Sequence, residues 1–213
     1  MKFVINLNLL RIFGFSIVLI SSQCASMSRK ESVPVIVDGT LDLSCKATNE
    51  NLHELLNIPG KETVKKLILS SGAITKLDKG TFDGFTSLEA LDLSKNLLTS
   101  LDENVFEGLT VRYLNLSNNK LKKISEGTFK PLKHWLEMLD LSNNLLYGRR
   151  IADLYSDDEE NEYWWSYSCT DYCLTPGIFD DLKLKSINLS GNQFCTGFWG
   201  GLQERFPHMH IIH

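Results

Sequence analysis

The chain has 213 residues, a formal net charge of −4 and 23% charged residues. This length suits one domain with enough material to bury a sizeable core. Because there is no surplus of basic residues to neutralise phosphates, nucleic acid is not expected as a partner. The sequence carries no glycine-rich phosphate loop, no His-Glu-x-x-His motif and no recognisable nucleophile motif. We therefore expect neither an enzyme nor a cofactor.

Residues 1–26 differ in kind from the rest of the chain. Lys2 and Arg11 are their only charged residues, an apolar run extends from Ile12 to Ile20, and small or polar residues follow. This order is typical of a secretory signal peptide. The alternative is a membrane anchor, but the apolar run is shorter than the roughly 20 apolar residues that a membrane span needs. We expect no later stretch of the sequence to span a bilayer. Secretion would place the chain outside the cell, where disulfides persist.

Internal repetition is the strongest signal in the sequence. Five segments share the spacing apolar-x-x-apolar-x-apolar, and they start at Val64, Leu88, Val111, Leu136 and Leu184. An asparagine follows at a fixed offset in the last four copies, whereas the first has Gly72 there. These asparagines are Asn96, Asn119, Asn144 and Asn192. A phenylalanine recurs later in four copies, as Phe82, Phe106, Phe129 and Phe179.

At these residues the chain resembles the leucine-rich-repeat family, in its extracellular type. The resemblance implies an α/β repeat solenoid, a horseshoe segment with a curved parallel β-sheet on its concave face. The leucines that alternate along each strand would point inward and stack on the next copy. The asparagines would hydrogen-bond backbone groups of neighbouring turns as a ladder, which should be weakest at Gly72.

The register divides the chain into a signal peptide, a cap, repeats and a tail. The caps of the family usually carry several cysteines, whereas here each end has a single one, Cys45 and Cys195. Small secreted invertebrate immune proteins of the family have similarly reduced caps, and the chain loosely resembles them. The expected divisions are 1–26 (signal peptide), 27–63 (N-terminal cap), 64–87, 88–110, 111–135, 136–183 and 184–206 (repeats, the last with the C-terminal cap), and 207–213 (tail).

The fourth copy contains an insertion, residues 147–173. It begins near Arg149-Arg150, which is either a processing site or two surface arginines paired with the acidic run that follows. That run, between Asp153 and Glu162, is either a solvated loop or part of a contact surface. The aromatic residues Tyr163, Trp164 and Trp165 come next, and they either pack on the solenoid or contact a partner. Tyrosine sulfation at Tyr155 and Tyr163 would add further negative charge.

The concave face is the default contact surface. Its outward side chains should form two columns, and Tyr113, flanked by Asp92 and Asp140, is the expected anchor. Asn115 and Asn188 begin N-glycosylation sequons in one column. The columns are Lys66, Ala90, Tyr113, Met138 and Ser186, and Ile68, Asp92, Asn115, Asp140 and Asn188.

The repeat register also constrains the cysteines. Cys173 and Cys195 should lie on adjacent turns, which predicts a disulfide between them, with Cys169–Cys195 as the rival. A Cys45–Cys195 bond is excluded, because five strand spacings of about 4.8 Å separate the two positions. The cysteine left over in the insertion would reach Cys45 only if the insertion folds back along the solenoid; otherwise it would be available for a bond to a partner chain.

Histidines at 208, 210 and 213 have an alternating spacing that suits zinc or copper, but no carboxylate accompanies them, so a polar tail without metal is expected. Taken together, the sequence predicts a secreted recognition module. Its partner would be another protein or a microbial or extracellular surface molecule, in innate immunity or cell signalling. The alternatives are a matrix component, or an enzyme inhibitor that acts through the acidic insertion.

Overall fold

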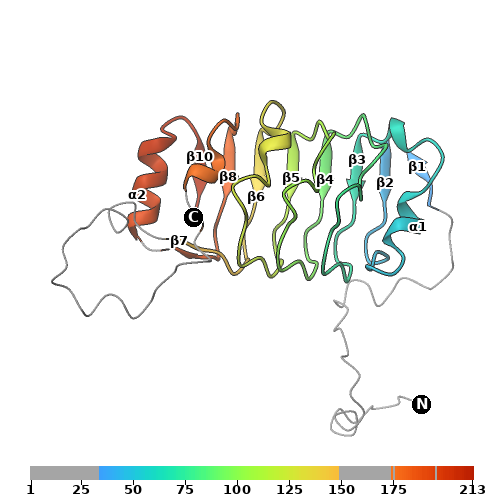
Figure 1. The fold of residues 1–213 in the computed structure, drawn as a ribbon, viewed down its shortest axis with the longest axis horizontal. Coiled ribbons are helices and arrows are strands. Elements are labelled where there is room, and N and C mark those ends of the chain that lie inside the picture. The colour runs from blue at the N-terminus through green and yellow to red at the C-terminus, as the bar shows by residue number, and fades with distance from the viewer. Residues whose placement is uncertain (1–33, 149–173, 175, 195) are drawn as a thin grey trace, which may run out of the picture.

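The computed structural model describes residues 34–148, 174, 176–194 and 196–213. Eight strands form one sheet in the order β1-β2-β3-β4-β5-β6-β8-β10 (Figure 1). The β1–β2 pair is antiparallel and the other neighbouring pairs are parallel. This stack is the solenoid that the repeat predicts. Its strands are β1 (Ile36–Val37), β2 (Thr40–Asp42), β3 (Lys66–Ile68), β4 (Ala90–Asp92), β5 (Tyr113–Asn115), β6 (Met138–Asp140), β8 (Ser186–Asn188) and β10 (His210–Ile212).

The strand register predicted from the repeat is confirmed. Leu91 lies opposite Leu67 on one side and Leu114 on the other, and all three side chains are buried. β6 pairs directly with β8, with Leu139 opposite Ile187, although 48 residues separate them. The insertion therefore leaves the sheet continuous.

The C-terminal end differs from the polar tail expected at residues 207–213. His210–Ile212 form β10, which pairs in parallel with β8 and places Ile211 opposite Ile187. These two isoleucines are 24 residues apart, which is one repeat length. The repeat motif is obscured because its two other apolar positions are occupied by His208 and His213.

The N-terminal end of the sheet is a hairpin. β1 and β2 are joined by Asp38 and Gly39, whose φ angles are 49° and 71°. A two-residue turn with both φ angles positive matches the right-handed twist of the strands it joins, and glycine adopts it without strain. The hairpin thus adds an antiparallel edge strand that belongs to no repeat.

The opposite side of the solenoid consists of loops and short helices. The recurring phenylalanines are buried there, and the rings of Phe106 and Phe129 stack at 6.2 Å. At the C-terminal end Phe198 of α2 stacks on Phe194 at 4.2 Å, so this helix covers the last turns (Figure 1). The helices are α1 (Leu52–Leu56), η2 (Lys61–Thr63), η3 (Lys130–Leu132), η6 (Pro176–Phe179) and α2 (Thr196–Arg205).

The asparagine ladder is present from the second copy onward. Asn119 is typical: its Nδ2 donates to the carbonyl oxygens of Leu93 and Leu116, both at 3.0 Å. Its Oδ1 accepts from the backbone N–H of Leu98 at 3.1 Å. One side chain therefore satisfies buried backbone groups of two successive turns. Equivalent bonds are made by Asn96, Asn144 and Asn192.

Gly72 interrupts the ladder for a steric reason. A Cβ atom at this position would lie 2.4 Å from the carbonyl oxygen of Ala47. That oxygen instead accepts from the backbone N–H of Ala73 at 3.0 Å. Asn49 provides a side-chain link nearby, since its Oδ1 accepts from Thr75 N–H at 2.7 Å. The first turn thus replaces one ladder bond with a close backbone contact.

A second, two-stranded sheet marks the point where the insertion leaves the solenoid. β7 (Tyr147–Gly148) pairs in parallel with β9 (Gln193–Phe194). The N–H of Leu174 donates to the carbonyl of Tyr147 at 2.8 Å. The chain therefore leaves and re-enters the solenoid at one place, away from the eight-stranded sheet.

Candidate functional site

The side chains that alternate with the buried leucines form one face of the eight-stranded sheet, the open sheet face. The register confirms the two predicted columns and extends both of them to β2 and β10. In β1, Val37 joins the first column beside Thr40. Val35 directly precedes β1, and extending the alternation of that strand by one residue assigns it to the second column. The first column is Val37, Thr40, Lys66, Ala90, Tyr113, Met138, Ser186 and His210; the second is Val35, Asp42, Ile68, Asp92, Asn115, Asp140, Asn188 and Ile212.

Exposed apolar side chains are concentrated on this face. Seven large apolar side chains of the described residues are exposed, and five of them belong to the two columns. Exposed apolar surface on one face marks interaction sites in soluble proteins, and here Tyr113 and Met138 on paired strands form its central pair. The five are Val35, Val37, Tyr113, Met138 and Ile212; the other two are Trp135 and Leu145.

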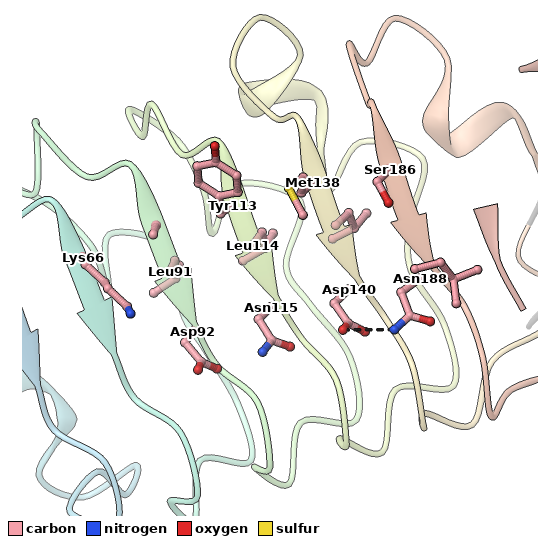
Figure 2. A pocket seen from close by; sticks show the side chains of 13 residues that line it. Lys66, Leu91, Asp92, Tyr113, Leu114, Asn115, Met138, Asp140, Ser186 and Asn188 are labelled. Carbon is pink, nitrogen blue, oxygen red and sulfur yellow. Dashed lines mark hydrogen bonds between the residues drawn. The ribbon is translucent and has the colours of Figure 1, made fainter. Parts of the chain in front are cut away.

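The middle of the face is hollowed. A cavity of about 450 Å³ lies over β3 to β10, and Figure 2 shows the side chains that line it. Tyr113 and Met138 stand side by side on paired strands, and they are 45% and 46% exposed. Ala90 precedes Tyr113 in the column, so its small side chain leaves space beside the ring. The hollow therefore has an apolar wall open to solvent.

The polar residues of the second column accept a backbone hydrogen bond from the turn that follows their strand. Asp92 Oδ1 accepts the backbone N–H of Ser94 at 2.9 Å, and Asp140 Oδ1 accepts that of Ser142 at 2.8 Å. Asn115 makes the same turn bond at 3.0 Å. From strand alternation alone, these residues are expected only to contact a ligand. The structure shows that they also stabilise the turn after each strand. The recurring Asp/Asn-x-Ser pattern in the sequence is the signal that could have predicted this turn bond.

The second carboxylate oxygens of the two aspartates differ. Asp140 Oδ2 accepts from Asn188 Nδ2 at 3.2 Å, as the dashed line in Figure 2 shows. Among the described residues, Asp92 Oδ2 accepts no hydrogen bond, and the ion pairs found there involve neither aspartate nor Lys66. Asp92 thus has an oxygen available to a ligand.

A row of alternating charge borders the face where β3 to β8 begin. Glu137 accepts a hydrogen bond from Lys185 Nζ at 2.7 Å, and Arg112 Nη1 lies 3.8 Å from its other oxygen. The hydrogen bond from Lys185, together with these two positive charges, lowers the pKa of Glu137. The row is Lys65, Glu89, Arg112, Glu137 and Lys185.

The structure brings part of the predicted site together. Lys66, Asp92, Tyr113, Met138 and Asp140 all line the hollow, and so do the sequon residues Asn115 and Asn188. The insertion aromatics Tyr163, Trp164 and Trp165 lie outside the described residues, as do Cys173 and Cys195.

Sequence reasoning missed the two ends of the face. Ile212 could have been found from the 24-residue spacing of Ile187 and Ile211, whereas Val35 and Val37 had no repeat signal. Within the described ranges, we find no group of three His, Cys, Asp or Glu side chains placed to hold a metal ion. No helix in that part of the chain has the length and apolar character needed to cross a membrane.

Comparison with known proteins adds sequence and structural relatives. The leucine-rich-repeat family model matches residues 62–121 and 109–146. Tsukushi of Gallus gallus is 39% identical over 167 residues, which cover 75% of this chain and 43% of that protein. Tsukushi-A of Xenopus laevis is 35% identical over 109 residues, 51% of this chain and 31% of that protein. The chain thus spans less than half the length of these relatives.

A solved structure supports the fold. A leucine-rich-repeat protein of Leptospira interrogans superposes with a TM-score of 0.50 and 24% identity, covering 75% of this chain and 34% of that one. The repeat register, the asparagine ladder, the family match and these relatives agree. The chain belongs to the leucine-rich-repeat family.

Proposed function

We propose that this chain is an extracellular recognition module that binds another protein through its open sheet face. The gathering of five exposed apolar side chains on that face carries the proposal. The face has the anatomy of a protein-binding surface, with an apolar centre at Tyr113 and Met138 and charged groups around it. The apolar run in residues 1–26 supports secretion, and innate immunity or cell signalling is the context in which we place the module.

Tyr113 is the expected anchor of this contact. A tyrosine buries a large, rigid surface at a low cost in conformational entropy, and tyrosine is enriched among residues that dominate binding energy. Its strand, β5, is the middle one of the seven parallel strands from β2 to β10, with two strands between it and each end of that run. This central position is where a partner would exclude water most completely.

The test uses two exposed aromatic residues as a matched pair. Tyr113 on the face is 45% exposed, and Trp135 off the face is 43% exposed. Immobilised protein would capture partners from extracellular fluid, and affinities for the captured partner would then be measured. We expect Tyr113→Ala to weaken binding by about 2 kcal/mol or more, roughly 30-fold, and Trp135→Ala to leave it unchanged. Unchanged binding in Tyr113→Ala would contradict the proposal and favour the insertion as the contact surface.

The same capture separates the proposed function from the alternatives. A soluble receptor or other soluble protein supports a recognition module. Retention on insoluble matrix would favour a matrix component. A captured protease whose activity falls in proportion to binding would favour an inhibitor.

A further inference from the structure

We propose that the hollow of the open sheet face binds a segment of a partner protein that presents an arginine or lysine beside an apolar side chain. This inference rests on the proposed function, because it specifies the ligand of the same site. The cation would bind at Asp92, and the apolar side chain would pack on Tyr113 and Met138.

Charge in the lining favours a cation. Three charged side chains line the hollow, and two of them are the carboxylates of Asp92 and Asp140. Lys66 is the third, and it lies in the other column on β3, at the edge of the lining (Figure 2). The second column contains the carboxylates of Asp42, Asp92 and Asp140 and no lysine or arginine. A partner's cation above this column meets negative charge at alternate strands.

Asp92 is the better placed of the two lining carboxylates. Asp140 has both oxygens engaged, since Oδ1 accepts from Ser142 and Oδ2 from Asn188. Asp92 uses Oδ1 for the turn at Ser94 and has Oδ2 free. The turn bond fixes the orientation of the carboxylate without consuming the second oxygen. A guanidinium or ammonium group can therefore bind there without breaking an existing hydrogen bond.

The neighbouring apolar wall suits the rest of such a segment. The Tyr113 ring lies on the strand next to Asp92, on the same face, and an arginine side chain stacks well on an aromatic ring while its guanidinium reaches a carboxylate. Met138 extends the wall with a flexible thioether that adapts to differently shaped side chains. The space beside Ala90 gives the ligand access to both groups.

Methionine methyl groups provide the probe. The chain has four methionines; Met138 is 46% exposed in the hollow, whereas Met209 is 6% exposed and serves as an internal reference. Protein labelled with ¹³C in the methionine methyl groups would be titrated with acetyl-Leu-Arg-Leu-amide and with its neutral analogue acetyl-Leu-citrulline-Leu-amide. The Met138→Leu variant assigns the signal.

We expect the arginine peptide to shift the Met138 signal saturably and to bind about tenfold more tightly than the citrulline peptide. Asp92→Asn should remove this preference and still fold, because an asparagine Oδ1 makes the same turn bond at Asn115 and Asn188. Asp42→Asn is the matched control, since Asp42 has the same turn bond but does not line the hollow. It should leave the preference intact.

Each other outcome has a defined meaning. Equal binding of the two peptides, or a preference that survives Asp92→Asn, overturns the cationic ligand while leaving an apolar binding face. No shift at Met138 with either peptide also overturns the inference. The proposed function is decided separately, by the Tyr113 and Trp135 variants against the whole partner.

Discussion

Lys185 and Glu137 are 48 residues apart in the sequence, and the Nζ of Lys185 lies 2.7 Å from Oε2 of Glu137. The two residues immediately precede β8 and β6. These strands are neighbours in the sheet, and the insertion lies between them in the sequence. Lys185 N–H also donates to the carbonyl oxygen of Glu137 at 2.8 Å. The pair therefore joins two turns of the solenoid at the point where the sequence repeat is longest.

This ion pair predicts a pH-dependent contribution to stability. Because Lys185 and Arg112 lower the pKa of Glu137 in the folded protein, its contribution is fully present above the pKa of the unfolded chain. It is lost as the pH falls through the lower, folded pKa. Glu137→Gln should therefore lower the Tm at pH 7, and this difference from the parent protein should close below about pH 4. Thermal unfolding followed by circular dichroism at several pH values measures it.

Glu89→Gln is the matched control for this prediction. Glu89 occupies the same position before β4, but none of the ion pairs in the described ranges includes it. We expect a smaller effect on Tm at pH 7. Equal effects of the two substitutions would show that the Lys185 contact contributes nothing specific.

The asparagine ladder predicts a larger loss of stability. Asn119→Ala leaves the buried Leu98 N–H without its side-chain acceptor. It also removes one of the two asparagine donors from each of the Leu93 and Leu116 carbonyl oxygens, which keep Asn96 and Asn144 as partners. Buried polar groups without partners cost more than the bond itself contributes, so we expect a loss of about 2–4 kcal/mol in the free energy of unfolding. Urea unfolding measures it.

Two further substitutions test whether the loss is specific to the ladder position and why the first copy has glycine there. Lys120→Ala, at the exposed neighbouring position, should change the free energy of unfolding by less than about 0.5 kcal/mol. Gly72→Asn restores the family residue, yet it should destabilise the protein, because the new Cβ would meet the Ala47 carbonyl oxygen. A stabilising effect of Gly72→Asn would mean that the backbone approach there is not required.

The fold could be predicted from the sequence wherever the repeat is strong. Between β3 and β8 each strand has one inward apolar residue at its centre and a second directly after its end, at fixed spacing. Both the strand and its outward columns therefore follow from the pattern. At β10, Ile211 alone keeps the pattern, and the sequence predicts a tail instead. The β1 hairpin depends on the local turn at Asp38 and Gly39, which repeats nowhere.

The candidate site shows a further limit of the same kind. The repeat register placed Tyr113, Asp92 and Asp140 on one face, because side-chain direction follows from strand alternation. It did not show which carboxylate oxygen remains free. That distinction depends on the contact of Asp140 with Asn188, whose strand follows the insertion and becomes a neighbour only through tertiary packing.

The sequons at Asn115 and Asn188 predict glycosylation on the open sheet face. Both asparagines accept the N–H of the serine two residues later, at 3.0 and 3.2 Å, and both line the hollow. We expect at least one to carry a glycan in protein secreted from eukaryotic cells. Treatment with an amidase specific for N-glycans should lower the mass, and separate Asn→Gln variants assign the site.

The position of the glycan affects the binding proposal. A glycan on Asn115 would stand next to Tyr113, two residues away on the same face of β5, and its removal should then increase partner affinity. A mass that does not change on treatment contradicts glycosylation at both sites.

The last prediction concerns the disulfide between Cys173 and Cys195, which lie outside the described residues. Their neighbours support it. Leu174 N–H donates to the carbonyl of Tyr147, and Tyr147 pairs with Gln193 while Gly148 pairs with Phe194. The residue after Cys173 and the residue before Cys195 thus contact the same short strand, β7. A bond there would hold the returning end of the insertion against the C-terminal cap.

The other cysteines narrow the alternatives. Cys45 is disulfide-bonded, and it follows β2, which five strand spacings separate from β8. Because these add up to about 24 Å and a disulfide needs Cα atoms within about 7 Å, Cys195 is not its partner. If Cys173 bonds Cys195, the candidates for the partner of Cys45 are Cys169 and, in a chain whose signal peptide is cleaved before residue 24, Cys24. Peptide mapping without reduction should yield a fragment joining residues 173 and 195. A 169–195 fragment would favour the rival pairing, and a free Cys195 or a 45–195 fragment would contradict the strand order at the C-terminal end.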